Sequence, residues 1–134
     1  MTSHFNKVQG EIELECETEI DSSHFLYEYD GKCRNLHGHR WRIKVTLTGT
    51  HQSIGEDGMV ADFDDLKTII DELDHKEINE IPPFDEVNPT AENIARYLAN
   101  EIDSYLIKKQ VMKASVKKVE IWETPDNKVT FKPF

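Results

Sequence analysis

Residues 11–24 read EIELECETEIDSSH, and polar and apolar side chains alternate along this stretch. The even positions are mostly apolar, as at Ile12 and Ile20, whereas every odd position from Glu11 to Asp21 is acidic. A period of two is typical of a β-strand with one buried face. The stretch therefore predicts a half-buried strand, and we interpret the acidic run as the solvent-facing side of a sheet.

A second alternating stretch, residues 39–48, predicts a strand that pairs with the first. Positions 40, 42 and 44 are basic, and the opposite face carries Trp41, Ile43, Val45 and Leu47. An antiparallel hairpin of the two strands sets the acidic face beside the basic face. Opposite charges across a strand pair contribute about 0.2–1 kcal/mol each, so the charge pattern favours this pairing.

Two helices are predicted by N-cap residues that precede amphipathic stripes. Asp62 precedes the first helix and Thr90 the second, and both side chains can accept from an open backbone N–H. Between the two helices, residues 74–89 contain three prolines and are expected to be mostly loop. The stripes consist of Phe63, Leu66, Ile69, Ile70 and Leu73 in the first helix, and of Ile94, Tyr97, Leu98, Ile102, Tyr105 and Leu106 in the second.

The C-terminal part of the chain predicts two further strands. Residues 116–123 place Val119, Ile121 and Glu123 on one face, and Val129 and Phe131 follow a turn at residues 124–127. The element order is then ββααββ. Strands joined as hairpins favour an α+β layer fold, in which two helices cover one face of a four-stranded antiparallel sheet.

Length and composition restrict the class of protein. The 134 residues suit a single domain, residues 1–134, and no apolar run approaches the roughly 20 residues of a membrane helix. A net charge of −10, spread along the chain, argues against nucleic acid or an anionic membrane as partner. The chain begins without a basic stretch followed by an apolar run and carries only two cysteines, so a cytoplasmic protein with reduced thiols is expected.

Three histidines are expected to converge at one end of the hairpin. His24 has the parity of the apolar positions in the first strand, and His37 and His39 have that of the apolar positions in the second. All three imidazoles therefore point toward the core-side face. Three neutral imidazoles suit Zn²⁺ and leave a fourth position open, which is the arrangement of a catalytic zinc rather than a structural one.

Three more residues or pairs each allow two interpretations. Cys33 is either a fourth zinc ligand or a reactive thiolate favoured by its basic neighbours. Asp74 and His75 are either an acid–base pair or a histidine placed at a helix C-terminus. Glu123 points toward the apolar side, where it either forms a salt bridge or accepts hydrogen bonds from a guanidine-like ligand edge. Cys16 is interpreted as a small buried side chain.

Several stretches together resemble the family of the 6-pyruvoyltetrahydropterin and 6-carboxytetrahydropterin synthases. They follow one another in the family's order and extend over nearly the whole chain from about residue 18. The matching stretches are Ser23-His24-Phe25, Cys33-Arg34-Asn35-Leu36-His37-Gly38-His39, Gly58-Met59-Val60-Ala61-Asp62-Phe63, Leu73-Asp74-His75-Lys76-Glu77-Ile78-Asn79, Pro89-Thr90-Ala91-Glu92-Asn93 and Trp122-Glu123-Thr124.

The resemblance implies the tunnelling fold, in which subunits join their sheets into a barrel and rings stack into a homo-oligomer, commonly a hexamer. It also implies roles for the candidate residues. These are zinc ligands (His24, His37 and His39), a catalytic thiol (Cys33), an acid–base pair supplied by a neighbouring subunit (Asp74 and His75), the carboxylate that anchors the pterin ring (Glu123) and a second segment of the pterin pocket (Thr90 and Glu92).

The spacing of the cysteine divides this family. Three residues separate Cys33 from His37, as in the bacterial queuosine-pathway enzymes, whereas animal-type pyruvoyl enzymes have five. The resemblance thus implies conversion of 7,8-dihydroneopterin triphosphate to 6-carboxy-5,6,7,8-tetrahydropterin, with release of acetaldehyde and triphosphate. A pyruvoyl-type synthase and a non-catalytic zinc module are the alternatives. Ser22-Ser23 in place of the family's alanines and the acidic first strand are departures.

Overall fold

The computed structural model describes residues 8–134, so the expectation about the first residues of the chain lies outside the described part. The strands are β1 (Glu11–His24), β2 (His37–Thr50), β3 (Ser115–Thr124) and β4 (Asn127–Phe131). The helices are α1 (Phe63–Asp71) and α2 (Ala91–Lys108), and the short 3-10 helices are η2 (Lys32–Arg34), η3 (His51–Ser53) and η4 (Ile78–Glu80). No helix in residues 8–134 is both long and apolar enough to cross a membrane.

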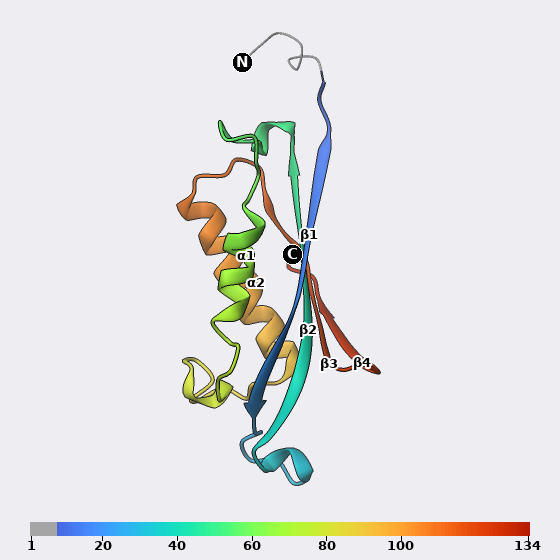
Figure 1. The fold of residues 1–134 in the computed structure, drawn as a ribbon, viewed down its shortest axis with the longest axis vertical. Helices are drawn as coiled ribbons and strands as arrows, with labels where there is room; N and C mark the ends of the chain where they lie inside the picture. Colours follow the sequence, from blue (N-terminus) through green and yellow to red (C-terminus); the bar gives the residue numbers. More distant parts are fainter. Residues whose placement is uncertain (1–7) are drawn as a thin grey trace.

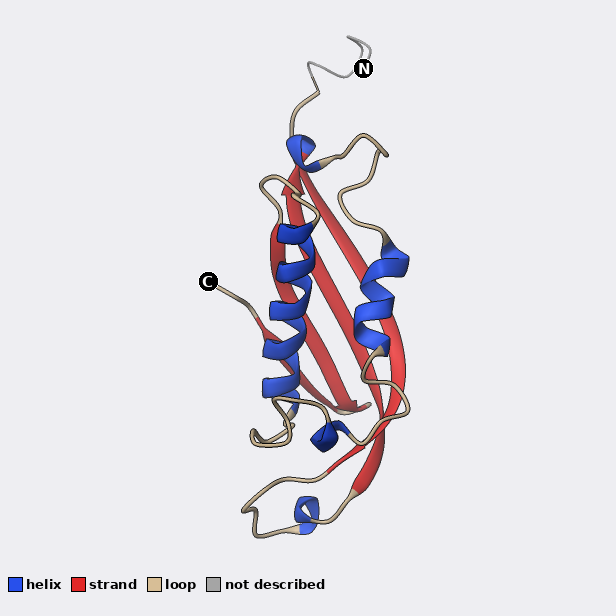
Figure 2. Ribbon diagram, turned by 90° about the vertical axis from the view of Figure 1, so that its left-hand side faces the viewer, coloured by secondary structure: helices blue, strands red, loops and turns tan. Residues whose placement is uncertain are grey.

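The four strands form one antiparallel sheet in the order β1-β2-β3-β4, and both helices cover the same face. Figure 1 shows the sheet edge-on with α1 and α2 on one side, and Figure 2 shows the helices lying across the strands. The predicted α+β architecture and the order ββααββ are confirmed. In this arrangement β1 and β4 are the two edge strands.

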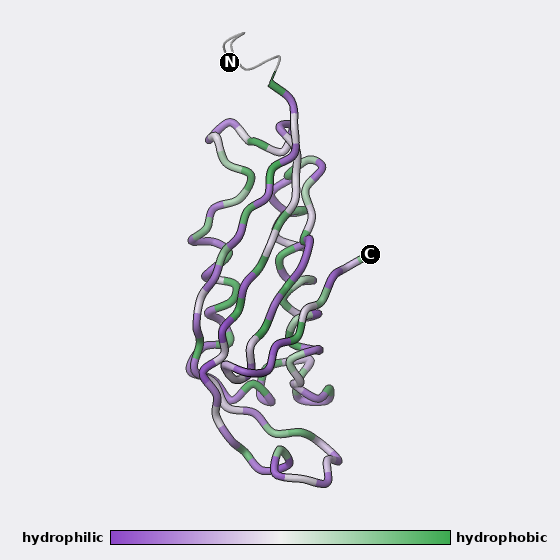
Figure 3. The backbone as a smooth tube through the Cα atoms, turned by 90° about the vertical axis from the view of Figure 1, so that its right-hand side faces the viewer, coloured by the Kyte–Doolittle hydropathy of each residue, from purple (hydrophilic) through white to green (hydrophobic). Residues whose placement is uncertain are grey.

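Alternation along the strands separates the core from solvent, as Figure 3 shows by hydropathy. On β1, Cys16 and Ile20 are buried, and Cys16 is the small buried side chain that the sequence predicts. On β2 the buried face consists of Trp41, Ile43, Val45 and Leu47. The helices contribute Leu66 and Ile70 of α1 and Ile94, Ala95, Leu98, Ala99, Ile102 and Leu106 of α2 to the same core.

Four acidic residues of β1 are paired with cations on β2 and β3. Asp21 pairs with Arg40 at 3.0 Å, Glu15 pairs with Lys44 at 3.3 Å, and Glu17 pairs with Arg42. Farther along, Lys117 of β3 reaches Glu13 at 3.0 Å. The acidic strand therefore has a structural explanation as one side of a cross-strand ladder on the solvent-facing side of the sheet.

Two details of α1 differ from the prediction. The side chain of Phe63, the first residue of the expected stripe, is 49% exposed, so the buried stripe begins at Leu66. The helix ends at Asp71, two residues early, although Leu73 remains fully buried in the following turn.

The connection between β1 and β2, residues 25–36, extends beyond the helices at the lower end of Figure 1. Side-chain amides hold its first residues. The amide of Asn79 accepts from the backbone N–H of Phe25 at 2.9 Å and donates to its carbonyl at 3.0 Å, and Asn88 makes the same type of pair with Tyr27. These bonds fix the chain immediately after His24.

Candidate metal centre and active site

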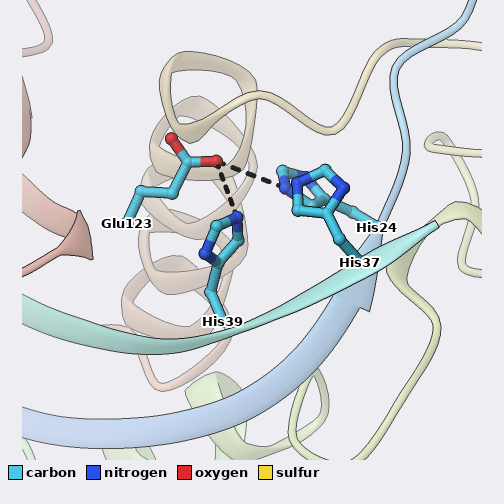
Figure 4. Close-up of side chains that lie close together, drawn as sticks. All are labelled: His24, His37, His39 and Glu123. Atoms are coloured by element: carbon cyan, nitrogen blue, oxygen red, sulfur yellow. Dashed lines mark ion pairs between the residues drawn. The ribbon is translucent and has the colours of Figure 1, made fainter. Parts of the chain in front are cut away.

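Four side chains from three strands converge at the end of the β1–β2 hairpin (Figure 4). His24 ends β1, His37 and His39 begin β2, and Glu123 lies near the end of β3. One ligand atom from each lies within 4.8 Å of those of the other three. His24 is buried, whereas Glu123 is one-third exposed. The convergence of the three histidines follows the strand parity read from the sequence.

Backbone carbonyls fix the orientation of two of the rings. The Nδ1 atom of His24 lies 2.7 Å from the carbonyl oxygen of Pro89, and Nδ1 of His37 lies 2.7 Å from that of Asn35. A carbonyl oxygen can only accept, so each Nδ1 carries the proton and donates. In the neutral rings, Nε2 of His24 and of His37 is therefore unprotonated and available as a ligand.

The three Nε2 atoms are buried, and within residues 8–134 none has a hydrogen-bond partner. Their nearest charged neighbour is the Glu123 carboxylate, 3.2 Å from Nε2 of both His24 and His39. Nitrogen lone pairs that face a carboxylate repel it unless a cation lies between them. Three buried imidazole Nε2 atoms, two of them on rings whose Nδ1 donates to a carbonyl, are a donor set that Zn²⁺ prefers, so these residues fit the metal.

Neighbouring groups shift the pKa of two members of the cluster, Glu123 and His39. Contacts with His24 and His39 hold the pKa of Glu123 below its ordinary value, although burial acts in the opposite direction. Burial lowers the pKa of His39, and the neighbouring His24 and His37 lower it further, against the effect of Glu123. Both directions favour the protonation states in which these groups bind a metal.

Trp41 forms the floor of the cluster. Its ring lies edge-on to His24 and His39, with centroid separations of 4.8 and 5.2 Å, and its Nε1–H donates to the carbonyl of Ser22 at 3.2 Å. A buried aromatic ring held by a hydrogen bond limits the rotation of the imidazoles above it. The first aromatic residue of the β2 core face thus also positions two candidate ligands.

Glu123 lies at an irregular point of the sheet. The register between β3 and β4 shifts by one residue between Trp122 and Thr124, which places Glu123 in a β-bulge. A bulge changes the direction of a side chain and frees it from regular cross-strand packing. A cavity of about 480 Å³ adjoins the carboxylate, and its lining includes His39, Arg40, Arg42, Trp122 and Glu123.

Cys33 lies in the short η2 helix, in the connection between the strands that carry the histidines. It is a free, partly buried thiol, and its carbonyl accepts from the N–H of Leu26 at 2.8 Å. The cluster of candidate ligands found among residues 8–134 does not include Cys33. This arrangement does not favour the interpretation of Cys33 as a fourth zinc ligand.

Asp74 and His75 form a contact at the free edge of β1. Asp74 Oδ2 lies 2.9 Å from His75 Nδ1, while Asp74 Oδ1 accepts from the backbone N–H of Asp21 at 2.8 Å. The bond from Asp21 is the main cause that lowers the pKa of Asp74, and His75 lowers it further. Neither residue belongs to the histidine cluster of its own chain.

The backbone of His75 adopts a conformation that most residues avoid. Its φ is 55°, and its N–H donates to the carbonyl of Asp21 at 2.7 Å. A left-handed conformation costs a non-glycine residue about 1–2 kcal/mol, which the bond to Asp21 offsets. The result is an imidazole side chain that is 79% exposed beside β1.

The second predicted segment of the pterin pocket, which contains Thr90 and Glu92, lies at the start of α2. The Thr90 hydroxyl caps the helix by accepting from the N–H of Asn93 at 3.2 Å, as the sequence predicts, and the Glu92 side chain is exposed. Pro89, which precedes them, accepts from His24. This bond joins the start of α2 to the metal cluster.

Sequence reasoning missed the groups that orient the imidazoles. The carbonyls of Asn35 and Pro89 act through the backbone, so their residue types carry no signal of the role. Trp41 was assigned to the core face, and the same parity that buries it also places it under the histidines. The β-bulge at Glu123 has no sequence signature in this chain.

Comparison with known proteins agrees with this geometry. Residues 13–133 match the family described as 6-pyruvoyl tetrahydropterin synthase. The chain is 31% identical to a Haemophilus influenzae 6-carboxy-5,6,7,8-tetrahydropterin synthase, over 81% of this chain and 90% of that protein. It is 33% identical to the Homo sapiens 6-pyruvoyl tetrahydrobiopterin synthase, over 76% of this chain and 71% of that protein.

The fold is also similar to a solved structure of that family. Caenorhabditis elegans 6-pyruvoyl tetrahydropterin synthase superposes with a TM-score of 0.71 at 28% identity, covering 93% of this chain and 97% of that one. The expectation of an enzyme of this family is confirmed. With the match over residues 13–133 and relatives above 30% identity, the chain belongs to the 6-pyruvoyl tetrahydropterin synthase family of enzymes.

Proposed function

We propose that this protein is a zinc-dependent lyase that converts 7,8-dihydroneopterin triphosphate to 6-carboxy-5,6,7,8-tetrahydropterin, acetaldehyde and triphosphate. The observation that carries the proposal is the set of three buried Nε2 atoms of His24, His37 and His39, which have no hydrogen-bond partner in the described part of the chain, within a member of this family. Bound zinc would act as a Lewis acid toward the hydroxyls of the substrate side chain.

The residues around the cluster supply proton transfer. Cys33, which lies in η2, takes a proton from the substrate side chain as a thiolate. His75 transfers protons on the other face, with Asp74 holding Nδ1 so that Nε2 faces outward. Because His75 is largely exposed at the edge of β1, its imidazole is available to a site on a neighbouring subunit.

Glu123, Thr90 and Glu92 form the pterin pocket in this proposal. A carboxylate recognises the ring N–H and amino group of a pterin with two parallel hydrogen bonds. The cavity beside Glu123, about 480 Å³, is of the size that small-molecule sites occupy. Arg40 and Arg42 in its wall are paired with Asp21 and Glu17, and we assign neither to the triphosphate.

The identity of the product separates the two reactions of this family. The three-residue spacing between Cys33 and His37, together with the names of several relatives, supports the carboxypterin product. The relative named 6-pyruvoyl tetrahydrobiopterin synthase keeps the pyruvoyl product as the second candidate. Incubation with 7,8-dihydroneopterin triphosphate, followed by chromatography, is expected to give acetaldehyde and the 6-carboxypterin. A 6-pyruvoyl product without acetaldehyde would contradict the proposal.

Cys33→Ala is expected to retain zinc and to lose turnover by at least about 100-fold, because it removes the base without removing a ligand. Metal analysis of the purified protein checks that zinc is retained, and the product assay checks the loss of turnover. Cys16→Ala is the matched control for the loss of a thiol, since Cys16 lies buried in the middle of β1. Stoichiometric loss of zinc in Cys33→Ala would favour a structural zinc module instead.

The proposal also covers the assembly of the protein, its compartment and its pathway. We propose a homo-oligomer, with a hexamer favoured, whose active sites lie between subunits and whose residues 1–134 act as one domain. The protein would work in the cytoplasm on a small pterin substrate, in queuosine biosynthesis, without nucleic acid or membrane partners. Size-exclusion chromatography with light scattering checks the assembly.

A further inference from the structure

Glu123 approaches the histidine nitrogens more closely than a pterin anchor needs to. Its Oε1 atom lies 3.2 Å from Nε2 of His24 and 3.2 Å from Nε2 of His39. In a tetrahedral zinc site with bonds of about 2.0–2.1 Å, neighbouring ligand atoms lie about 3.3 Å apart. The distances from the carboxylate oxygen to these two nitrogens match that separation, and Figure 4 shows the oxygen directed at them.

The charges around Glu123 also suit a cation bound beside its carboxylate. Among residues 8–134, no lysine or arginine forms an ion pair with Glu123, because Arg40 and Arg42 of the same cavity are engaged by acidic residues of β1. The Nδ1 atom of His24 donates to Pro89, so the Nε2 atom that faces Glu123 carries a lone pair in the neutral ring. A carboxylate in this position is stabilised by a cation held between it and the histidines.

We propose that Glu123 is the fourth ligand of the zinc ion while substrate is absent, and that the pterin ring displaces it from the metal. This inference rests on the proposed function. A pterin edge held by two parallel hydrogen bonds would engage both carboxylate oxygens, so the ring competes with the metal for the Glu123 side chain. The bulge and the one-third exposure of Glu123 give the side chain room to move between the two positions.

The first experiment measures metal binding without turnover. Glu123→Gln is expected to weaken zinc affinity by at least about tenfold, since even the groups that merely orient metal ligands contribute that much. It is also expected to change the visible absorption spectrum of the cobalt-substituted protein. Glu19→Gln is the matched control, because Glu19 lines the same cavity but lies exposed on the solvent-facing side of β1. Equal zinc affinity and equal cobalt spectra in wild type and Glu123→Gln would overturn the inference.

The second experiment uses the unmodified chain and therefore does not depend on the folding of a variant. The probe is 6-methylpterin, which lacks the side-chain hydroxyls that would bind the metal directly. Saturating the cobalt-substituted wild type with it is expected to shift the spectrum toward that of Glu123→Gln, and to leave the Glu123→Gln spectrum unchanged. A wild-type spectrum that stays unchanged when the pterin is bound would overturn the displacement.

The two experiments separate this inference from the proposed function. If the wild-type protein binds no zinc or cobalt, the proposed function fails, because its metal centre is absent. If the wild type binds metal and forms the carboxypterin while Glu123→Gln binds metal equally well, only the role of Glu123 as a ligand is wrong.

Discussion

Ser22 is a hydroxyl in a buried position, two residues before the first candidate ligand. Its Oγ donates to the carbonyl of Leu73, which lies just beyond the end of α1. The Ser22 hydroxyl therefore links β1 to the segment that carries Asp74 and His75. The neighbouring Ser23 interacts with that segment through its backbone, whose N–H donates to Lys76 at 3.0 Å.

Ser22→Ala is expected to lower the free energy of unfolding by about 1 kcal/mol, because the buried carbonyl of Leu73 loses its donor. Urea denaturation at neutral pH measures the change. Ser23→Ala serves as the control, since its backbone hydrogen bond survives the substitution and its stability is expected to stay within about 0.5 kcal/mol of wild type. Equal losses in the two variants would show that the Ser22 hydroxyl makes no net contribution.

At the scale of single residues, the sequence predicts the histidine cluster better than it predicts the groups that orient the imidazoles. Parity alone is enough to bring His24, His37 and His39 to one face, because each strand has a strict period of two. The carbonyls that orient His24 and His37 come from segments far apart in the chain, and backbone groups are the same in every residue. Their positions depend on tertiary packing, which a local pattern does not contain.

The two helices show which structural features can be predicted from neighbouring residues in the sequence. Asp62 and Thr90 cap α1 and α2 as predicted, because a cap depends only on the residues that follow it. The exposure of Phe63 was not predicted, since it depends on tertiary packing around the first turn of the helix. The same limit applies to Glu123, whose bulge arises from the register between β3 and β4.

A hydrogen bond joins the helices near the C-terminal end of α2. The hydroxyl of Tyr105 donates to Asp65 of α1 at 2.7 Å, and burial together with this bond raises the pKa of Tyr105 to about 12. The folded state therefore holds the phenolic proton more tightly than the unfolded state, where the pKa is about 10. Its contribution to stability is fully present below pH 10 and is lost as the pH rises toward 12.

Tyr105→Phe is expected to be about 1 kcal/mol less stable than wild type at neutral pH, because Asp65 loses its donor. The difference between the two proteins should shrink as the pH rises from 10 to about 12, since only the wild type loses this contribution. Urea titrations at a series of pH values measure it. Tyr29→Phe, at an exposed site, is the control and should track the wild type throughout. A difference independent of pH would argue that Tyr105 contributes by packing alone.

The two proposed catalytic elements lie in different segments of the chain. Cys33 lies in the connection beyond the hairpin, and the Asp74–His75 pair lies along the free edge of β1. A single chain predicts the strands and the histidine cluster well, because both arise from contacts within it. It does not predict which surfaces meet in an assembly, since a pattern of exposed residues does not name its partner.

Mixing two inactive variants tests the proposal that each site combines Cys33 of one subunit with His75 of another. Cys33→Ala and His75→Ala are each expected to be nearly inactive. If equal amounts are unfolded together and refolded, random assembly should restore about a quarter of wild-type activity, because a quarter of the sites receive both intact residues. Each variant refolded alone is the control. If both residues of a site came from the same chain, no hybrid site would be complete and the mixture would stay inactive.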